Sequence, residues 1–162
     1  MISALPHNAV FLADEVKTTR FGAWLASYLY AGDCVLLDGA IGAGKSHLAR
    51  AVIQAKLGRL EDVPSPTFTL VQTYQAKNFE IWHADLYRLS HADELIELGL
   101  DAAFPVALCL IEWPKRLGHI TPTNPILITL SNSHDGRTAT ITAPHRPDLM
   151  LALDQDWARH DQ

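Results

Sequence analysis

The sequence lacks any hydrophobic run long enough to cross a membrane, because no stretch approaches the ~20 consecutive apolar residues that a spanning helix needs. Residues 1–15 also lack the basic start of a secretory signal peptide and contain early acidic residues. We therefore expect a cytoplasmic protein with no membrane association.

An excess of positive charge is absent as well. The chain has 13 Lys and Arg residues against 18 Asp and Glu residues, which gives a formal net charge of -5. A protein that grips nucleic acid by itself usually carries a basic excess, because neutralising phosphates supplies most of the affinity. Any role in RNA biology is therefore expected to act through a partner.

Cysteine is scarce, and the ligand spacings typical of zinc sites are missing. Cys34 and Cys109 lie in the apolar runs CVLLDG and ALCLIEW, which favours two buried core residues over a disulfide or a metal pair. His83 and Asp85 are two residues apart and share a strand face, which would allow a metal site with His91. The other histidines are scattered, so His83 is better interpreted as a core residue or one that supports a site from behind.

The composition is that of one globular domain. The chain has 162 residues, of which 48% are hydrophobic and 19% charged, so it is long and apolar enough to bury a core. No internal repeat or low-complexity segment divides it. Apolar runs alternate with segments of helical periodicity, which predicts an α/β sheet. Strands are expected at residues 8–12, 34–38, 68–74, 79–85, 106–111, 126–130 and 137–142.

Capping residues mark the ends of the expected helices. Thr18 or Thr19 would cap the first helix, and Gly32 would end it. Gly58 would end the second helix, and Ser90 would cap the third. The three helices are expected at residues 18–30, 45–57 and 91–98.

One motif carries a specific chemistry. The segment CVLLDGAIGAGKSHLAR contains G-x-x-x-x-G-K-[ST], formed by Gly39, Gly44, Lys45 and Ser46. Backbone N–H groups of such a loop surround phosphate at a helix N-terminus, the lysine reaches the β- and γ-phosphates, and the hydroxyl ligates magnesium. The motif predicts bound ATP with magnesium, contacted by Gly39, Ala40, Ile41, Gly42, Ala43, Gly44, Lys45, Ser46 and His47.

The loop completes the fold prediction. We expect a single-domain, three-layer α/β fold of the P-loop NTPase type, with a central, mostly parallel sheet and an antiparallel C-terminal strand pair. Pro114 would interrupt sheet pairing after the strand at 106–111. The ATPase domain would span residues 1–145, and residues 146–162 would form a C-terminal helix or a partly ordered tail.

Two carboxylates are expected to face the loop. Asp85 and Glu112 each end an apolar run, and the carboxyl edge of a parallel sheet is where ligands bind. We expect both to organise the metal and the attacking water, although either residue could instead be a solvated acid at a strand end. Thr67, in the segment SPTFT, either senses the γ-phosphate or the metal, or belongs to a plain turn bracketed by prolines. With Lys45, these three residues form the predicted catalytic set.

Taken together, these motifs resemble the bacterial TsaE family, also called YjeE. The markers are GAIGAGKS, VPSPTFTLV, Tyr74, HADLYRL, the stretch with Glu94, Leu95 and Leu98-Gly99, and IEWP, and they cover most of the chain. The resemblance implies a small ATPase needed to form threonylcarbamoyladenosine beside the tRNA anticodon. It implies ATP, magnesium, weak hydrolysis by the isolated protein, and TsaD and TsaB as partners, with tRNA reached through that complex.

The resemblance also implies residue roles. Ser46 and Glu112 would hold magnesium, Asp85 would have the acidic catalytic role close to the metal, and Trp113 would be a functional tryptophan. The stretch with Asp14 and Glu15 and, in the last hairpin, Arg137 match nucleotide-contacting positions. Three positions depart from the family pattern, namely Ala40, His47 and Lys115.

Two other functions are compatible with the phosphate loop. A small nucleotide or metabolite kinase usually has several lid arginines, and only Arg59 and Arg88 lie between the loop helix and IEWP. A non-hydrolysing switch would bind nucleotide and signal to a partner. The guanine-specific motif N-K-x-D is absent, which argues against a GTPase.

Overall fold

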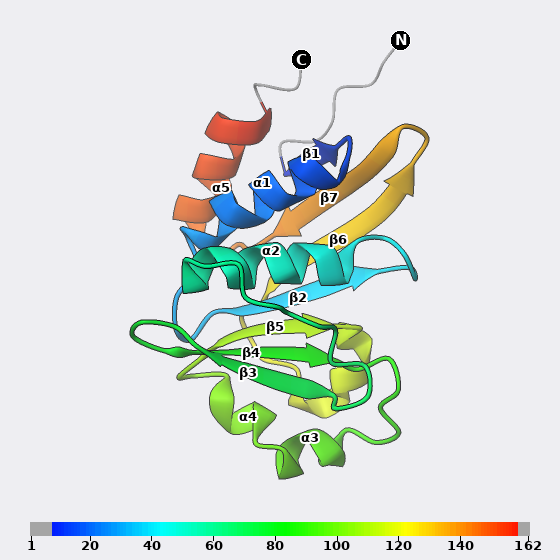
Figure 1. The fold of residues 1–162 in the computed structure, drawn as a ribbon, viewed down its shortest axis with the longest axis vertical. Coiled ribbons are helices and arrows are strands. Elements are labelled where there is room, and N and C mark those ends of the chain that lie inside the picture. The colour runs from blue at the N-terminus through cyan, green and yellow to red at the C-terminus, as the bar shows by residue number, and fades with distance from the viewer. Residues whose placement is uncertain (1–7, 159–162) are drawn as a thin grey trace.

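A single mixed sheet forms the centre of the fold (Figure 1). The computed structural model of the protein describes residues 8–158. Residues 1–7 and 159–162, which include the end of the predicted C-terminal helix or tail, lie outside the described part. Within that part the strand order is β1-β7-β6-β2-β5-β4-β3. The strands are β1 Ala9–Leu12, β2 Cys34–Gly39, β3 Val71–Gln75, β4 Glu80–Asp85, β5 Leu108–Glu112, β6 Ile126–Ser133 and β7 Gly136–Thr142.

The four central strands are parallel, and the outer strands are antiparallel. β2 pairs in parallel with both β5 and β6, and β4 continues the parallel set beside β5. β7 runs antiparallel to β6, β1 antiparallel to β7, and β3 antiparallel to β4. The predicted mostly parallel sheet with an antiparallel C-terminal pair is therefore confirmed.

Helices cover both faces of the sheet and make three layers. Alternate residues of β2 belong to different cores: Val35 and Leu37 pack with one set of helices, and Cys34 and Leu36 with the other. The first set is α1 Glu15–Ala26, α2 Lys45–Leu57 and α5 Pro147–Leu153. The second set is α3 Asp93–Glu97, α4 Leu100–Ala103 and the 3-10 helix η1 Pro114–Ile120.

The two cysteines are buried core residues, as expected. Cys34 and Cys109 are register partners on the neighbouring strands β2 and β5, and both are free thiols. Burial raises the pKa of Cys109 to about 12, and burial is also the main reason why the pKa of Cys34 lies well above its usual value. Both thiols are therefore protonated and unreactive at neutral pH.

The predicted bounds of the first helix were wrong at both ends. Helix α1 begins at Glu15 because the Asp14 carboxylate accepts a hydrogen bond from the Lys17 amide at 2.8 Å. Thr18 lies inside the helix, where its hydroxyl donates to the Asp14 carbonyl. The helix ends at Ala26 rather than near Gly32, although Tyr28 and Leu29 continue the apolar spacing into the core.

Several other boundaries differ from the prediction. β3 begins at Val71 rather than residue 68, because Leu70 has a φ of 66° and ends a turn. The expected helix 91–98 covers only Asp93–Glu97; its N-cap residue is Ala92, so Ser90 is not its cap. β5 includes Glu112, which places this carboxylate within the strand end. Helix 45–57 is confirmed, and Gly58 ends it with a φ of 69°.

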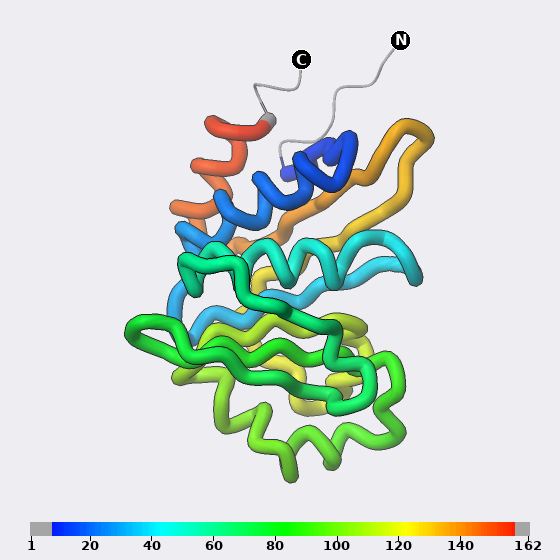
Figure 2. The backbone as a smooth tube through the Cα atoms, viewed as in Figure 1, coloured from blue at the N-terminus to red at the C-terminus, as the bar shows by residue number. Residues whose placement is uncertain are grey.

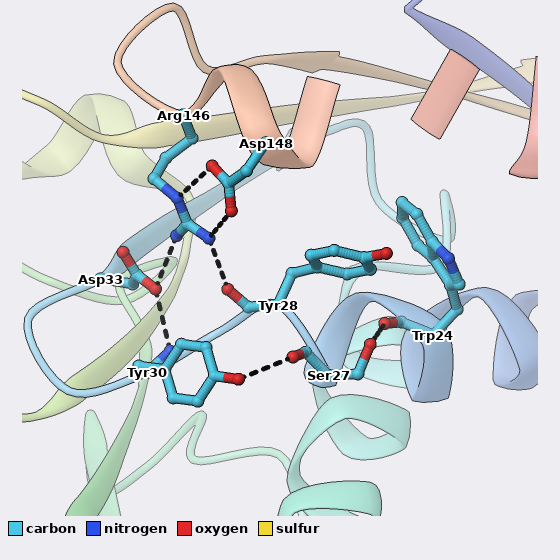
Figure 3. Close-up of polar contacts among 7 residues, drawn as sticks. All are labelled: Trp24, Ser27, Tyr28, Tyr30, Asp33, Arg146 and Asp148. Atoms are coloured by element: carbon cyan, nitrogen blue, oxygen red, sulfur yellow. Dashed lines mark hydrogen bonds and ion pairs between the residues drawn. The ribbon is translucent and has the colours of Figure 1, made fainter. Parts of the chain in front are cut away.

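The C-terminal helix is tied to the loop between α1 and β2. Arg146 donates to Asp33 at 2.9 Å, to the Tyr28 carbonyl at 2.7 Å, and to Asp148 at 2.9 and 3.0 Å (Figure 3). Leu149 and Leu153 of α5 reach the core, and the short helix η2 Asp154–Ala158 follows. The division of the chain at residue 145 stays a prediction. In the described residues, no helix has both the length and the apolar character needed to cross a membrane.

Candidate functional site

The predicted phosphate loop connects the end of β2 to the start of α2 (Figure 2). Its backbone needs glycine at two places. Gly44 has a φ of 103°, and an added Cβ would lie 2.5 Å from the Arg137 guanidinium. A Cβ on Gly39 would lie 2.5 Å from the Leu130 carbonyl oxygen of β6. The backbone conformation at Gly44 and the close approach of β6 at Gly39 favour glycine, and the loop leads directly into the N-terminus of a 13-residue helix.

Lys45 is folded back onto the loop. Its Nζ donates to the carbonyl oxygens of Gly39 at 2.6 Å and Ala40 at 2.9 Å, and it lies 4.0 Å from the centre of the Trp113 ring. Burial lowers the pKa of Lys45, against the opposing effect of nearby carboxylates, chiefly Glu112. The ammonium group is thus held inside the loop by contacts that an incoming anion can replace.

Glu112 lies at the centre of a buried hydrogen-bond chain. The Ser46 hydroxyl donates to Glu112 Oε1 at 2.7 Å, and His83 Nε2 lies 2.7 Å from Glu112 Oε2. His83 and Glu112 are only 1% and 2% exposed. The strand-end acid predicted from the sequence is therefore a buried, paired carboxylate rather than a solvated one.

Asp85 lies next to Glu112 because the two are register partners on β4 and β5. Its Oδ2 accepts hydrogen bonds from the hydroxyls of Ser65 at 3.1 Å and Thr67 at 3.4 Å, and its Oδ1 accepts from the Tyr87 amide at 3.1 Å. Thr67 does lie in a turn, which the hydrogen bond from the Leu70 amide to the Pro66 carbonyl closes, and from this turn its hydroxyl faces Asp85.

Arg137 reaches the loop from the far hairpin. It lies at the start of β7, and its guanidinium donates to the Gly42 carbonyl at 3.1 Å. Trp113, which also lines the cavity, has a φ of 58° and packs against Tyr87 with ring centres 5.0 Å apart. A basic side chain and two aromatic rings thus border the phosphate loop.

These groups surround one cavity of about 370 Å³. Most of the predicted site residues line it, namely Glu15, Ile41, Gly42, Gly44, Lys45, Ser46, His47, Thr67, Asp85, Glu112, Trp113 and Arg137. Asp14 caps α1 and Ala43 is buried in the core, and neither lines the cavity. Gly39 and Ala40 line a neighbouring hollow instead, with Trp113 and Lys115.

The sequence patterns assigned no role to two residues that line this cavity, and they did not reveal one contact to His47. Tyr87 and Ser65 line the cavity, and the family markers HADLYRL and VPSPTFTLV contained both without assigning them a role. The Thr19 hydroxyl oxygen lies 2.8 Å from His47 Nε2. This contact joins two segments that are distant in the chain, so no local pattern could reveal it.

The donor set matches magnesium rather than a transition metal. Ser46, Asp85 and Glu112 offer only oxygen atoms, and Mg²⁺ is commonly held by one or two carboxylates together with phosphate oxygens. Across residues 8–158, no group of three or more His, Cys, Asp or Glu side chains is arranged to hold a metal alone. The residues present therefore fit a metal that arrives with a polyphosphate.

Comparison with known proteins agrees with this geometry. The sequence profile of the family described as "Threonylcarbamoyl adenosine biosynthesis protein TsaE" matches residues 12–139. The chain belongs to the TsaE family. Curated TsaE relatives include that of Rickettsia bellii, 37% identical over 81% of this chain and 91% of the relative, and that of Haemophilus influenzae, 35% identical over 82% and 87%.

A solved structure shares the TsaE fold seen here. The crystal structure of Bacillus subtilus YdiB superimposes with a TM-score of 0.74, covers 95% of each chain and is 25% identical in sequence. The α/β architecture with its mixed sheet is therefore that of a known relative.

Proposed function

We propose that this TsaE-family chain is the magnesium-dependent, ATP-binding and ATP-hydrolysing subunit that supports threonylcarbamoylation of the adenosine beside the tRNA anticodon. The observation that carries the proposal is the 2.7 Å contact between Ser46 Oγ and Glu112 beneath a phosphate loop that also holds Lys45. Relatives named as tRNA threonylcarbamoyladenosine biosynthesis proteins support the pathway, and a role in tRNA modification favours a cytoplasmic location.

Lys45 is the residue that must move when ATP binds. Its Nζ leaves the carbonyls of Gly39 and Ala40 and turns to the β- and γ-phosphates. The loop amides and the α2 N-terminus bind the remaining phosphate charge, and Arg137 keeps the loop in shape through Gly42. The ring of Trp113, freed from the ammonium group, is available to the nucleotide.

Ser46, Glu112 and Asp85 form the acidic side of the site. Bound magnesium would neutralise charge on the β- and γ-phosphates, and Ser46 and Glu112 would hold it there. Asp85, with one oxygen facing the hydroxyls of Ser65 and Thr67, would orient the attacking water. The hydroxyls of Ser65 and Thr67 line the cavity, so their hydrogen bonds to Asp85 can change when the γ-phosphate is lost.

Partner proteins complete the proposed function. We infer weak hydrolysis by the isolated chain and stimulation by a complex of TsaD and TsaB, which would perform the transfer and contact the tRNA. The formal charge of -5 supports indirect rather than direct tRNA binding.

A kinase activity is less well supported. Arg88 lies over the Phe68 ring at 4.8 Å, and Arg59 pairs with Glu61 at 2.8 Å, so both arginines that a phosphate-clamping lid would need are engaged elsewhere. Product analysis separates the two functions, since an ATPase releases inorganic phosphate and a kinase yields a phosphorylated small molecule.

The test is ATP turnover by the chain alone and with TsaD, TsaB and tRNA. We expect slow hydrolysis alone, clear stimulation by the complex, and loss of turnover in Lys45→Ala and Glu112→Ala. Absence of stimulation would refute the partner role. Turnover surviving in Lys45→Ala would place the chemistry outside this loop, and ATP binding without hydrolysis in the full complex would favour the switch.

A further inference from the structure

His83 is a buried histidine that the proposed chemistry does not yet use. It lies in the parallel strand β4, in register with Leu110 of β5, and is 1% exposed. Its face of the sheet is the one that α2 covers, because Ile81 and Leu110 on that face belong to the same core as Leu48 and Val52. An apolar residue would be the ordinary choice at such a position.

Only one of the two ring nitrogens of His83 has a hydrogen-bond partner among the described residues. A carboxylate only accepts, so the 2.7 Å contact between His83 Nε2 and Glu112 Oε2 requires the proton on Nε2. Nδ1 is fully buried and has no hydrogen-bond partner among the described residues. A buried polar atom without a partner costs stability, so packing does not explain this histidine. Within residues 8–158, the hydrogen bond to Glu112 is the only one that the ring makes.

This contact fixes the orientation of Glu112. With Oε2 held by His83, the carboxylate presents Oε1 to the Ser46 hydroxyl, which donates its proton there. The Ser46 oxygen then has its lone pairs free for the cavity that both residues line. If the Glu112 carboxylate rotated, the Ser46 hydroxyl would lose its hydrogen-bond acceptor, and its orientation would no longer be fixed.

We propose that His83 is a positioning residue that holds Glu112, and through it Ser46, in the geometry that binds the magnesium ion of the nucleotide. The inference rests on the proposed function and adds a residue to it. Partners that hold metal-ligating groups from behind tune metal affinity, because they fix the direction of the ligand atoms. His83 acts on the metal through Glu112 and does not touch the reacting atoms.

A matched pair of substitutions tests this role. In His83→Gln the amide nitrogen can take the place of Nε2 and donate to Glu112, whereas in His83→Asn the amide nitrogen lies near the position of Nδ1 and cannot reach. The readout is equilibrium binding of a fluorescent ATP analogue during a titration with Mg²⁺, repeated with the metal chelated. His145→Asn, at an exposed position, controls for substitution of a histidine as such.

His83→Asn is expected to raise the Mg²⁺ concentration for half-maximal binding by about 10- to 100-fold, while affinity for the metal-free nucleotide stays unchanged. His83→Gln is expected to stay close to the wild type. A Mg²⁺ dependence in His83→Asn like that of the wild type would overturn the proposal. Both variants could also need the same higher Mg²⁺ concentration, in step with their losses of thermal stability. That result would overturn the proposal too, since it indicates a packing role alone. A wild-type chain that binds no nucleotide would instead refute the proposed function itself.

Discussion

At the scale of single residues, the site consists of polar side chains that form hydrogen bonds with one another or with the backbone. Glu112 accepts hydrogen bonds from Ser46 and His83, Asp85 accepts from Ser65 and Thr67, and Lys45 donates to loop carbonyls. In the proposed function, ATP would replace the loop carbonyls as the partner of Lys45, while His83 would keep Glu112 in place. Substitutions here should therefore change binding and turnover more than folding.

Glu112→Gln preserves the size of the side chain and removes its charge. We expect magnesium-dependent ATP turnover to fall by about 100-fold, a typical loss for a positioned group in catalysis, and magnesium affinity to weaken. Turnover is measured by phosphate release, and thermal unfolding serves as the control for structure. Unchanged turnover together with unchanged metal affinity would mean that Glu112 has neither role.

Trp113 should report the movement of Lys45. The ammonium group lies 4.0 Å from its ring centre, so ATP binding should change Trp113 emission as Nζ turns to the phosphates. The change should vanish in Trp113→Phe and in Lys45→Met, and persist in Trp82→Phe, whose indole lies outside this cavity and donates to Glu80. An ATP-dependent signal that survives Trp113→Phe would contradict this assignment.

At the scale of helices and strands, local patterns predicted some elements well and others poorly. The loop from Gly39 to Ser46 and the helix behind it were predictable because glycine positions and a strand–loop–helix pattern specify them locally. The contacts of His83 with Glu112 and of Arg137 with Gly42 were not, because they depend on strand order and on segments far apart in the chain. The first helix was misplaced because apolar spacing continues beyond Ala26.

The Arg146 contacts should anchor helix α5. Arg146 is 17% exposed and bridges Asp33, Asp148 and the Tyr28 carbonyl (Figure 3). Arg146→Met removes charged hydrogen bonds and leaves the half-buried Asp33 carboxylate with the Tyr30 amide but without the guanidinium, so the free energy of unfolding in urea should fall by about 2 kcal/mol. Arg59→Met is the matched control: its pair with Glu61 is exposed, and its loss should cost less than about 0.5 kcal/mol. Similar values for both variants would contradict an anchoring role.

The same contacts predict a response to acid. The hydrogen bond from Arg146 is the main reason why the pKa of Asp148 falls from 3.8 to about 2. Because the folded pKa is depressed, the stabilisation is present above pH 3.8 and is lost as the pH falls from about 4 toward 2. Asp148→Asn should flatten the pH dependence of unfolding in this window, as measured by urea denaturation. An equally steep loss in the variant would assign the acid sensitivity to other groups.

At the scale of the whole molecule, the parallel centre of the sheet gathers distant segments at one edge. The ends of β2, β4 and β5 bring the phosphate loop, Asp85 and Glu112 together, and the hairpin of β6 and β7 adds Arg137. Ligands of parallel sheets bind at this carboxyl edge. The fold thus explains how one small domain gathers the residues of the proposed nucleotide site.

The most direct test of this account is a crystal structure of the chain with magnesium and a non-hydrolysable ATP analogue. The account predicts the polyphosphate within the loop from Gly39 to Ser46, the metal beside Ser46, and Lys45 Nζ removed from the carbonyls of Gly39 and Ala40. A loop without the analogue and with Lys45 still on those carbonyls, or a nucleotide bound elsewhere, would contradict it.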